Sequence, residues 1–334
     1  IDRADVQDYE PLLVGDLPDF DVCFFNVENL FDPIDDGHGD WGDWAPGFPI
    51  SGSQDGLLEY QSKLDRLAGF IVSTMRSCML IGVEEVEGKQ AVYDELASAI
   101  SSQDENTNWS GVYVESGDPR DISQGFLIRE DVRLESLSAV SGADYEQRLE
   151  DGVVDFVRTI PHGQFRFLGG TDHETYVHVY AAHFKSKLSS SSCPVPDCTD
   201  VRKKEAADLR DLLAYHHQQG EYAIAGGDFN DFIDSSPIEI LEGSTAVQGL
   251  FQDIPESAWW TYVFNGESEV LDHIYVTSNL ANNPGWEIQF SPVHGQADFP
   301  STEQASDHDA LRAIFRSLGI NNHGYLQYLP SLFK

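Results

Sequence analysis

The sequence is poor in basic residues. Its 334 residues include 20 Lys and Arg against 57 Asp and Glu, which gives a formal net charge of −37. A nucleic-acid binder normally carries a basic face, so this balance argues against tight, contact-rich duplex binding. It is typical of a protein that stays soluble in salty water or binds cations. Because basic residues are scarce, one short cluster of them is informative: Lys185, Lys187, Arg202, Lys203 and Lys204.

Long apolar runs are also missing. No stretch reaches the roughly 20 residues that a membrane-spanning helix needs, so we expect no stable membrane insertion. Hydrophobic residues still make up 41% of the chain, which is enough for a full core. Neither an internal repeat nor a low-complexity linker is present, and we predict a strap at 1–20, one domain at 21–318 and a tail at 319–334. The sequence indicates no protein partner.

Cysteine is rare as well, with four residues. Cys193 and Cys198 bracket a four-residue loop, which predicts a local disulfide. Cys23 and Cys78 lie in or beside apolar strands and form either a second bridge or two buried thiols. No Cys-x-x-Cys and His pattern completes a zinc site, so none is expected. Together with Ile1 in place of Met, which suggests a processed mature form, the cysteines favour a secreted, extracellular or periplasmic protein.

The order of apolar patterns predicts an α/β fold. Strands at 21–27 and 79–83 alternate with helices at 59–76 and 89–100, which indicates an α/β core. Short β-rich runs follow, then a helix at 201–219 and further strands. The β-rich runs, read as antiparallel strands, are 111–115, 125–129, 132–140, 153–160, 164–168 and 175–183.

One segment combines a buried strand with a polar end. Residues 222–225 are apolar, and Gly-Gly-Asp-Phe-Asn-Asp follows at 226–231. Asp228 and Asn230 should therefore lie where a strand ends, two positions apart and on the same side. After them, Ser235 or Ser236 can cap a helix that Pro237 opens.

Other strands end in polar residues too. In the acidic run after the strand at 79–83, period two places Glu85 on the side of Val83 and Glu84 on the other. Each such residue alone is more often structural than catalytic. Together they offer oxygen donors that suit Mg²⁺, Mn²⁺ or Ca²⁺, and two histidines for acid–base work. The set is Asn26, Glu85, His183, Asp228, Asn230, Asp272, Asp307 and His308.

Six ordered motifs resemble the endonuclease/exonuclease/phosphatase superfamily, most closely its bacterial, often secreted, nuclease-like branch. They extend over about residues 21–316. They are Phe25-Asn26-Val27-Glu28-Asn29-Leu30-Phe31-Asp32, Gly82-Val83-Glu84-Glu85-Val86-Glu87, His183-Phe184-Lys185-Ser186-Lys187, Gly227-Asp228-Phe229-Asn230-Asp231, Leu271-Asp272-His273 and Ser306-Asp307-His308. The resemblance implies a four-layered α/β sandwich, in which two packed mixed sheets are flanked by helices and the site lies at one edge.

The resemblance also implies a role for each residue. Glu85 would be the principal ligand of Mg²⁺ or Mn²⁺, with Ca²⁺ as an alternative, and Asn26 and Asp307 would lie close to the ion. Asp228 and Asn230 would contact the nucleophilic water, the metal or the phosphate. His308 would be the general base, oriented by Asp272, and His183 would bind the phosphate or protonate the leaving oxygen. A ligand role for Glu28 stays open.

Three basic residues are candidates for substrate binding: Lys185, Lys187 and Arg129, the last being either a phosphate clamp or a surface residue. The predicted function is metal-dependent phosphodiester hydrolysis by an extracellular nuclease acting on DNA, with RNA as an alternative. The competing hypotheses are a phosphatase or phospholipase-like enzyme on small, lipid or sugar phosphates, and a non-catalytic matrix or assembly protein of the same fold. The charge of −37 favours the former over a nuclease, unless high salt screens it.

Overall fold

A computed structural model describes residues 19–34, 54–104, 107–140, 156–168, 174–187, 198–299 and 304–318. The predicted strap at 1–20 lies outside the described residues except at its last two positions, and the predicted tail at 319–334 lies outside them entirely. None of the described helices is long and apolar enough to cross a membrane.

Two six-stranded sheets form the centre of the fold. The first has the order β13-β14-β1-β2-β4-β3, with β1 Phe20–Leu30, β2 Leu80–Glu87, β3 Trp109–Val114, β4 Ile122–Arg129, β13 Trp286–Val293 and β14 Ala310–Ser317. The second has the order β5-β6-β7-β8-β12-β9, with β5 Val132–Val140, β6 Ile160–Phe167, β7 Thr175–Ala181, β8 Ala223–Asp228, β9 Val247–Gly249 and β12 Asp272–Thr277. Both sheets contain parallel and antiparallel pairs, as predicted.

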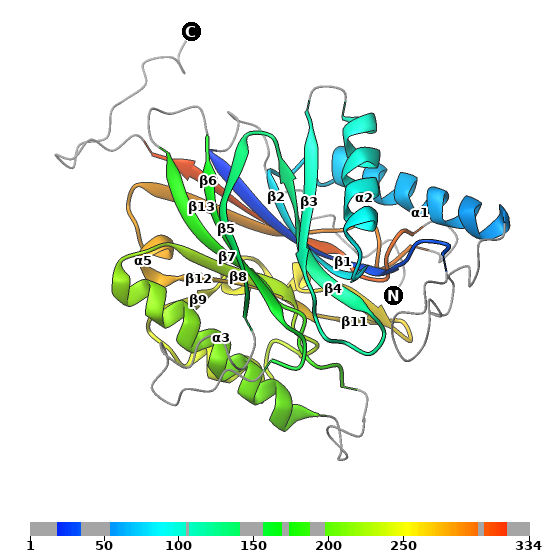
Figure 1. The fold of residues 1–334 in the computed structure, drawn as a ribbon. Coiled ribbons are helices and arrows are strands. Elements are labelled where there is room, and N and C mark those ends of the chain that lie inside the picture. Colours follow the sequence, from blue (N-terminus) through cyan, green and yellow to red (C-terminus); the bar gives the residue numbers. More distant parts are fainter. Residues whose placement is uncertain are drawn as a thin grey trace, which may run out of the picture.

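Helices cover the outer faces of the two sheets (Figure 1). The helices α1 Gln54–Ser73 and α2 Gln90–Gln103 share an apolar cluster with the first sheet, whereas α3 Thr199–Gln219 and α4 Ser236–Glu242 share one with the second. The four-layered α/β sandwich is therefore confirmed. The smaller elements are α5 Ser278–Ala281, the 3₁₀ turns Phe251–Asp253 and Glu256–Ala258, and the hairpin of β10 Tyr262–Phe264 with β11 Glu267–Glu269.

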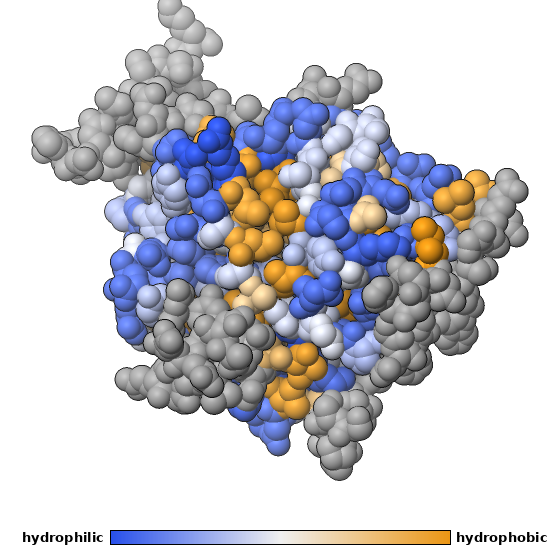
Figure 2. All heavy atoms as spheres, in the orientation of Figure 1, coloured by the Kyte–Doolittle hydropathy of each residue, from blue (hydrophilic) through white to orange (hydrophobic). Residues whose placement is uncertain are grey.

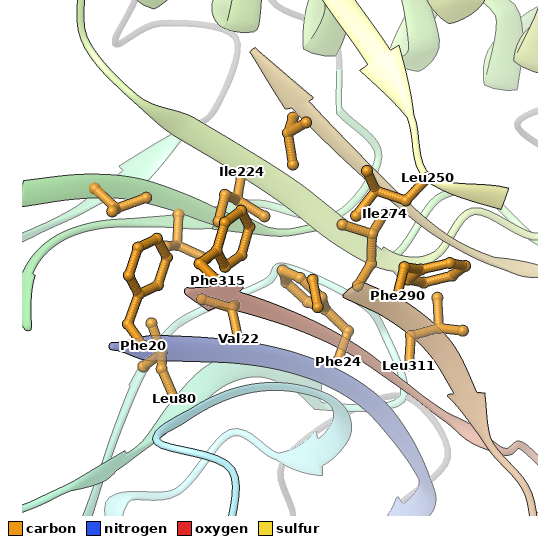
Figure 3. Packing of buried hydrophobic residues seen from close by; sticks show 14 of the residues in the cluster. Phe20, Val22, Phe24, Leu80, Ile224, Leu250, Ile274, Phe290, Leu311 and Phe315 are labelled. Atoms are coloured by element: carbon orange, nitrogen blue, oxygen red, sulfur yellow. The ribbon is translucent and has the colours of Figure 1, made fainter. Parts of the chain in front are cut away.

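The side-chain alternation of β1 builds two cores at once. Phe20, Val22 and Phe24 lie between the sheets, and the intervening Cys23 and Phe25 pack with the helical layer. Figure 3 shows the inter-sheet core, in which strands from both sheets contribute side chains.

One aromatic ring fits between the sheets because two facing positions lack a side chain. A Cβ atom at Gly82 of β2 would lie 2.6 Å from the Phe24 ring, and one at Gly226 of β8 would lie 2.4 Å from it. Real Cβ atoms do not approach carbon so closely, so any larger residue would displace the ring. Phe24 therefore fixes how far apart the two sheets lie next to the polar strand ends.

Strand direction places those strand ends at one edge of the sandwich. β1 runs parallel to β2, and β7 runs parallel to β8, so their carboxyl ends meet. β12 runs antiparallel to β8 with Asp272 opposite Asp228, and β14 begins beside the end of β1. Residues from both sheets therefore converge without a long loop.

Several sequence expectations need correction. β2 has a register shift between Val83 and Val86, and both valines pack against the helical layer, so period two does not continue to Glu85. β13 was not predicted, because its Trp-Glu-Ile-Gln-Phe-Ser-Pro pattern breaks at Pro292. Within the strand predicted at 153–160, residues 156–159 are irregular and β6 begins only at Ile160. The predicted helix after Ser235 is α4, but the Ser235 hydroxyl makes no capping hydrogen bond.

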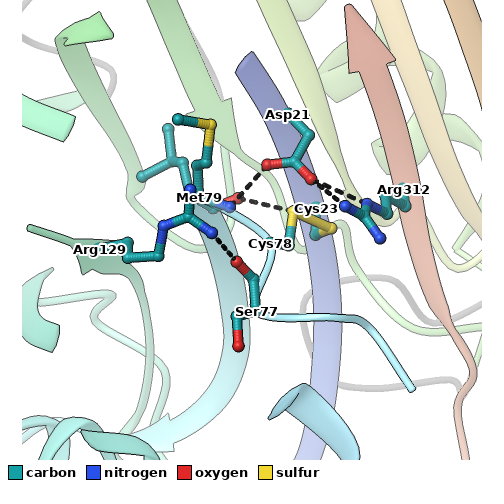
Figure 4. The surroundings of a disulfide bond; sticks show 8 residues. Asp21, Cys23, Ser77, Cys78, Met79, Arg129 and Arg312 are labelled. Carbon is teal, nitrogen blue, oxygen red and sulfur yellow. Dashed lines mark hydrogen bonds and ion pairs between the residues drawn. A yellow bond between two sulfur atoms is a disulfide. The ribbon is translucent and has the colours of Figure 1, made fainter. Parts of the chain in front are cut away.

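A disulfide joins Cys23 of β1 to Cys78, two residues before β2 (Figure 4). Of the two alternatives for these thiols, a bridge or two buried thiols, the structure shows the bridge. Beside it, Asp21 accepts a hydrogen bond from the Met79 amide at 2.7 Å and forms an ion pair with Arg312. Cys198 is disulfide-bonded too, while Cys193, its predicted partner, lies outside the described residues.

Much of the surface is hydrophilic. In the face drawn in Figure 2, hydrophilic residues surround a smaller apolar area. Exposed large apolar side chains do occur among the described residues, such as Ile34, Leu58 and Phe264. Single exposed apolar side chains are normal for globular proteins and indicate no partner by themselves.

Candidate active site

A buried histidine–carboxylate pair lies at the polar edge. Nδ1 of His308, just before β14, lies 2.8 Å from Oδ2 of Asp272 at the start of β12. Burial lowers the pKa of His308, but the carboxylates of Asp272 and Asp228 outweigh burial and hold that pKa well above 6.5. The pairing fixes the ring so that Nε2 points toward Asp228, whose Oδ2 is 3.8 Å away.

Asp228 is the centre of the cluster. Its Oδ2 accepts hydrogen bonds from the side-chain amides of Asn26 and Asn230, both at 3.1 Å, and lies 3.6 Å from Nε2 of His183. Burial raises the pKa of Asp228 to about 7, against the opposing effect of His308. The ligand atoms of Asp228, Asp272 and His308 all lie within 4.8 Å of one another. His308, which precedes β14 of the first sheet, therefore meets two carboxylates of the second sheet.

Glu85 lies beside this centre because of the irregularity in β2. Glu85 adopts a left-handed φ of 62°, which turns its side chain out of the strand alternation. Its Oε2 accepts a hydrogen bond from the Asn29 amide at 3.1 Å, and its Oε1 lies 3.8 Å from Nε2 of His183. Asn29 is itself at a left-handed φ of 45° in the matching irregular end of β1. Two strained strand ends thus hold one carboxylate, a feature common at functional sites.

Negative charge accumulates around Glu85. Burial raises the pKa of Glu28 to about 7, and repulsion from Asp307 and Glu85 adds to that rise. Burial likewise raises the pKa of Asp307, although His308 opposes this. Lys63 of α1 donates a hydrogen bond to the Glu28 carbonyl. Burial lowers the pKa of Lys63 to about 8. Glu28, whose role the sequence left open, therefore shares this corner with two of the predicted metal ligands.

Glu84 occupies a different environment from its neighbour. Its side chain is fully buried, neither carboxylate oxygen has a hydrogen-bond partner, and Oε1 lies within 2.4 Å of where a Gly227 Cβ would be. Burial first, and then Asp272 and Asp228, raise the pKa of Glu84 well above 4.5, so this carboxyl is held neutral. A neutral, enclosed acid is a poor cation ligand, which favours Glu85 in that role.

His183 is buried in a neutral form. Burial and then Arg158 and Arg120 lower the pKa of His183 well below 6.5. Arg158 donates to the carbonyl oxygens of His183 at 3.4 Å and Phe184 at 2.6 Å, and its Nε lies 2.7 Å from Asp118. Arg120 lies 3.9 Å from Glu85. His183 therefore lies near both cations and the carboxylates of Asp228 and Glu85.

Sequence reasoning missed Arg120, Arg158 and Lys63. No motif includes them, and the two arginines lie near Asp118, one before β4 and one before β6. The scarcity of basic residues could have indicated them, because each Lys or Arg in a chain with 57 acidic residues is a candidate for a specific role.

The three basic residues predicted for substrate binding have separate environments. The Lys185 side chain bonds to Ser186, and its charge contributes to the lowered pKa of His183. Nζ of Lys187 lies 3.1 Å from the ring centre of Phe232. Arg129 is at the end of β4 that pairs with the start of β2, whereas Glu85 is near the other end of that strand pair. Arg129 binds Asp131, and it also binds the Ser77 carbonyl, as Figure 4 shows. The structure therefore places Arg129 away from the cluster.

The donor set at the cluster matches a hard divalent cation. Glu85, Asp307 and the Asn26 carboxamide supply oxygen, and the mutual repulsion of Glu28, Glu85 and Asp307 is the condition that a bound cation relieves. Nearby, Asp228 and His308 can bind and deprotonate a water molecule, and His183 can donate a hydrogen bond. The arrangement suits attack of water on an electrophile that carries negative charge.

Comparison of structures finds the same fold in proteins of distant sequence. An endonuclease/exonuclease/phosphatase from Bacteroides vulgatus has a TM-score of 0.56 at 15% identity, covering 89% of this chain and 98% of that one. A mannosyl-6-phosphatase from Bacteroides thetaiotaomicron gives 0.58 at 13%, covering 89% and 99%. Truncated TDP2 from Caenorhabditis elegans gives 0.55 at 15%, covering 89% and 97%.

Comparison with curated proteins found no match. A family model, in contrast, matches residues 21–301, which include all strands from β2 to β13, all of β1 but its first residue, and all the predicted site residues before Asp307. The chain therefore belongs to the endonuclease/exonuclease/phosphatase family.

Proposed function

We propose that this protein is a divalent-metal-dependent hydrolase that cleaves phosphodiester bonds with activated water. The observation that carries the proposal is that two histidines and their carboxylate partners meet around Asp228. His308, held by Asp272, lies 3.8 Å from Asp228, and His183 lies 3.6 Å from Asp228 and 3.8 Å from Glu85. Family membership supports a phosphoester as the substrate. The contacts of these side chains indicate the role of each in the reaction.

Glu85, Asp307 and Asn26 would hold the cation. A bound Mg²⁺ or Mn²⁺ would neutralise the negative charge that develops on the phosphoryl oxygens. Glu28 would reinforce the site by adding charge, and Lys63 would limit the repulsion while the ion is absent. The oxygen-only donor set disfavours zinc, which prefers nitrogen and sulfur ligands.

His308 is the proposed general base. Its Nδ1 is held by Asp272, so Nε2 accepts a proton from water as the water oxygen attacks phosphorus. Asp228, fixed by Asn26 and Asn230, accepts the second hydrogen of that water and orients it. As the new P–O bond forms, the bond to the leaving oxygen breaks, and that oxygen takes up a proton from solvent or from the imidazolium.

His183 is the proposed phosphate-binding residue. The sequence left two roles for it, phosphate binding and protonation of the leaving oxygen. Because its pKa is lowered well below 6.5, its ring is neutral at pH 7 and favours donation of a hydrogen bond from Nε2 over transfer of a proton. Arg120, 3.9 Å from Glu85, would add a second contact to a phosphoryl oxygen.

DNA is the proposed substrate, and the bacterial secreted nuclease-like branch is the proposed subgroup. The cations around His183, namely Arg120, Arg158 and Lys185, provide a local place for a phosphodiester backbone. A second candidate is a small, lipid or sugar phosphate, which the net charge of −37 favours because it repels a long polyanion. Secretion is supported by the Cys23–Cys78 disulfide, since such bonds persist in oxidising compartments.

A substrate panel tests the proposal. Purified protein with Mg²⁺ or Mn²⁺ is assayed on plasmid DNA, single-stranded DNA, bis-p-nitrophenyl phosphate, inositol phosphates and sphingomyelin. We expect hydrolysis of DNA and of the model diester, and its loss in the His308→Ala and Asp228→Ala variants. Glu59→Gln on the exposed face of α1 is the control and should retain activity. Full activity in both site variants would refute the site, and exclusive cleavage of monoesters would support the second candidate.

A further inference from the structure

We infer that His162, His178 and His216 form a transition-metal site that is separate from the catalytic cluster. One ring nitrogen from each histidine lies within 4.8 Å of a ring nitrogen from each of the others. The three residues come from β6, β7 and α3, so no spacing in the sequence brings them together. Three neighbouring imidazoles are a ligand set that zinc, copper and nickel favour. The rings of His178 and His216 are stacked, with 4.1 Å between centroids, so the His216 ring would turn on metal binding to direct its nitrogen at the ion.

The contacts identify the nitrogens that face inward. Nε2 of His162 lies 2.9 Å from Nδ1 of His178, and Nε2 of His216 lies 2.7 Å from the Tyr180 hydroxyl. The ring of His162 stacks on that of Tyr180, with 4.4 Å between centroids. The three nitrogens and the phenol oxygen thus gather on the α3-covered side of the second sheet.

The opposite ring nitrogens have polar partners of their own. Nδ1 of His162 lies 3.2 Å from the Ser138 hydroxyl, and Nδ1 of His216 lies 2.7 Å from Oε2 of Glu221. Nε2 of His178 lies 3.7 Å from the same Glu221 oxygen and 3.4 Å from the Gln164 amide. Metal-binding histidines almost always use their outer nitrogen in this way, because the outer bond fixes the ring and its tautomer.

Burial and access also fit a metal. His162 and His216 are 7% and 2% exposed, which protects bound metal from exchange, whereas the side chain of Glu221 is 44% exposed. Glu221 would hold the outer nitrogens of His216 and His178, and a water molecule would take the fourth position beside three imidazoles.

The site is far from the catalytic edge. His178 pairs with Ala223 at the start of β8, and Asp228 ends that strand five residues later. At about 3.3 Å per residue the two sites are roughly 16 Å apart. The bound ion would tie α3 to two strands of the second sheet, so its expected effect is on stability and not on chemistry.

Zinc binding to the full chain tests the inference. The protein is stripped with a chelator, and zinc or cobalt is added to the Glu85→Gln variant, which weakens the catalytic metal site. We expect one tightly bound zinc per chain, a rise in the melting temperature, and visible cobalt absorption typical of a four-coordinate nitrogen-rich site. X-ray absorption at the zinc edge should show imidazole nitrogens.

A matched pair of variants decides between a metal site and a metal-free hydrogen-bond network. His178→Gln should abolish the tight site, while His217→Gln, which changes the neighbouring histidine on α3 that contacts Asn279, should leave it intact. If His178→Gln folds poorly, Glu221→Gln should still weaken zinc affinity by roughly 10- to 100-fold. Zinc binding that is equal in all three variants, or no zinc retained by the Glu85→Gln protein, would overturn the inference.

Discussion

The Nδ1 atom of His308 lies 2.8 Å from Oδ2 of Asp272, although Asp272 is in the second sheet and His308 precedes a strand of the first. Asp272 begins β12, and His308 stands two residues before β14. Asp272 therefore determines both the orientation of the imidazole and the pH at which the imidazole becomes a base.

The first prediction concerns this pair. Asp272→Asn should lower kcat by roughly 10²- to 10⁴-fold, because the amide holds His308 less well and no longer stabilises the imidazolium. The pKa of His308 should fall, since Asp272 raises it, so the acidic limb of the pH–rate profile should move to lower pH. Steady-state rates on a model diester between pH 5 and 9 measure both effects. An unchanged acidic limb would contradict the assignment of His308 as the titrating base.

The second prediction uses two adjacent glutamates as a matched pair. Glu85→Gln should greatly weaken Mn²⁺ binding, whereas Glu84→Gln should have little effect, since Glu84 is enclosed and its raised pKa keeps it neutral. Isothermal titration with Mn²⁺, and the stabilisation that Mn²⁺ gives in thermal unfolding, report the binding directly. The reverse order of effects would assign the ligand role to Glu84.

The third prediction concerns the spacing of the sheets. Gly226→Ala should cost about 1–3 kcal/mol of unfolding free energy, because the new methyl group would meet the Phe24 ring and the His273 carbonyl. Gly69→Ala in α1 is the control and should stabilise by about 0.5–1 kcal/mol, because its Cβ finds room and glycine is a poor helix former. Urea unfolding measures both. Equal stability of the two variants would show that the Phe24 contact is not tight.

The fourth prediction concerns the Cys23–Cys78 disulfide, which closes a loop with a sequence separation of 55. By the loop-entropy model its removal should destabilise the fold by about 4 kcal/mol. Urea unfolding of the Cys23→Ala, Cys78→Ala double variant, compared with the oxidised protein, tests this. A loss below about 1 kcal/mol would mean that packing of the two strands alone holds this part of the sheet.

The fifth prediction concerns pH and stability. Burial lowers the pKa of His273 to about 4, and its Nε2 lies 2.9 Å from the Asp231 carbonyl. The unfolded chain takes up this proton near pH 6.5, so the stabilisation is fully present above pH 6.5 and is lost as pH falls toward 4. The shift amounts to roughly 3 kcal/mol. The difference in unfolding free energy between the wild type and His273→Gln should therefore narrow by that amount from pH 7 to pH 4, and a constant difference would refute the lowered pKa.

Much of the fold was predictable because the main strands contain apolar runs. Such runs begin or occupy β1, β2 and β8, and α1 has an apolar stripe, so the alternation indicated an α/β core. The four-layered sandwich was predicted from the family resemblance and not from the alternation. β13 escaped notice because its polar residues and Pro292 interrupt the pattern, and it is ordered by pairing with β14. This pairing depends on the tertiary structure, so the local sequence of β13 does not predict it.

The site was predictable where a motif marks it and not elsewhere. Asp228 ends β8, Asp272 begins the antiparallel β12 and His308 precedes β14, so the strand directions bring the three side chains to one edge. The turn of Glu85 out of β2 depends on a left-handed backbone that alternation cannot indicate. Arg120 and Arg158 lie in irregular segments with no periodicity, and only the folded chain places them beside His183.

Phe24, seated between Gly82 and Gly226, acts as a spacer between the two halves of the cluster. Glu85 and His308 are carried by one sheet and His183, Asp228 and Asp272 by the other, so a slip of a single ångström between the sheets would separate base from carboxylate. The geometry of catalysis is thereby set from the interior. Residues that do not touch this interior contact can change without altering the spacing of the cluster.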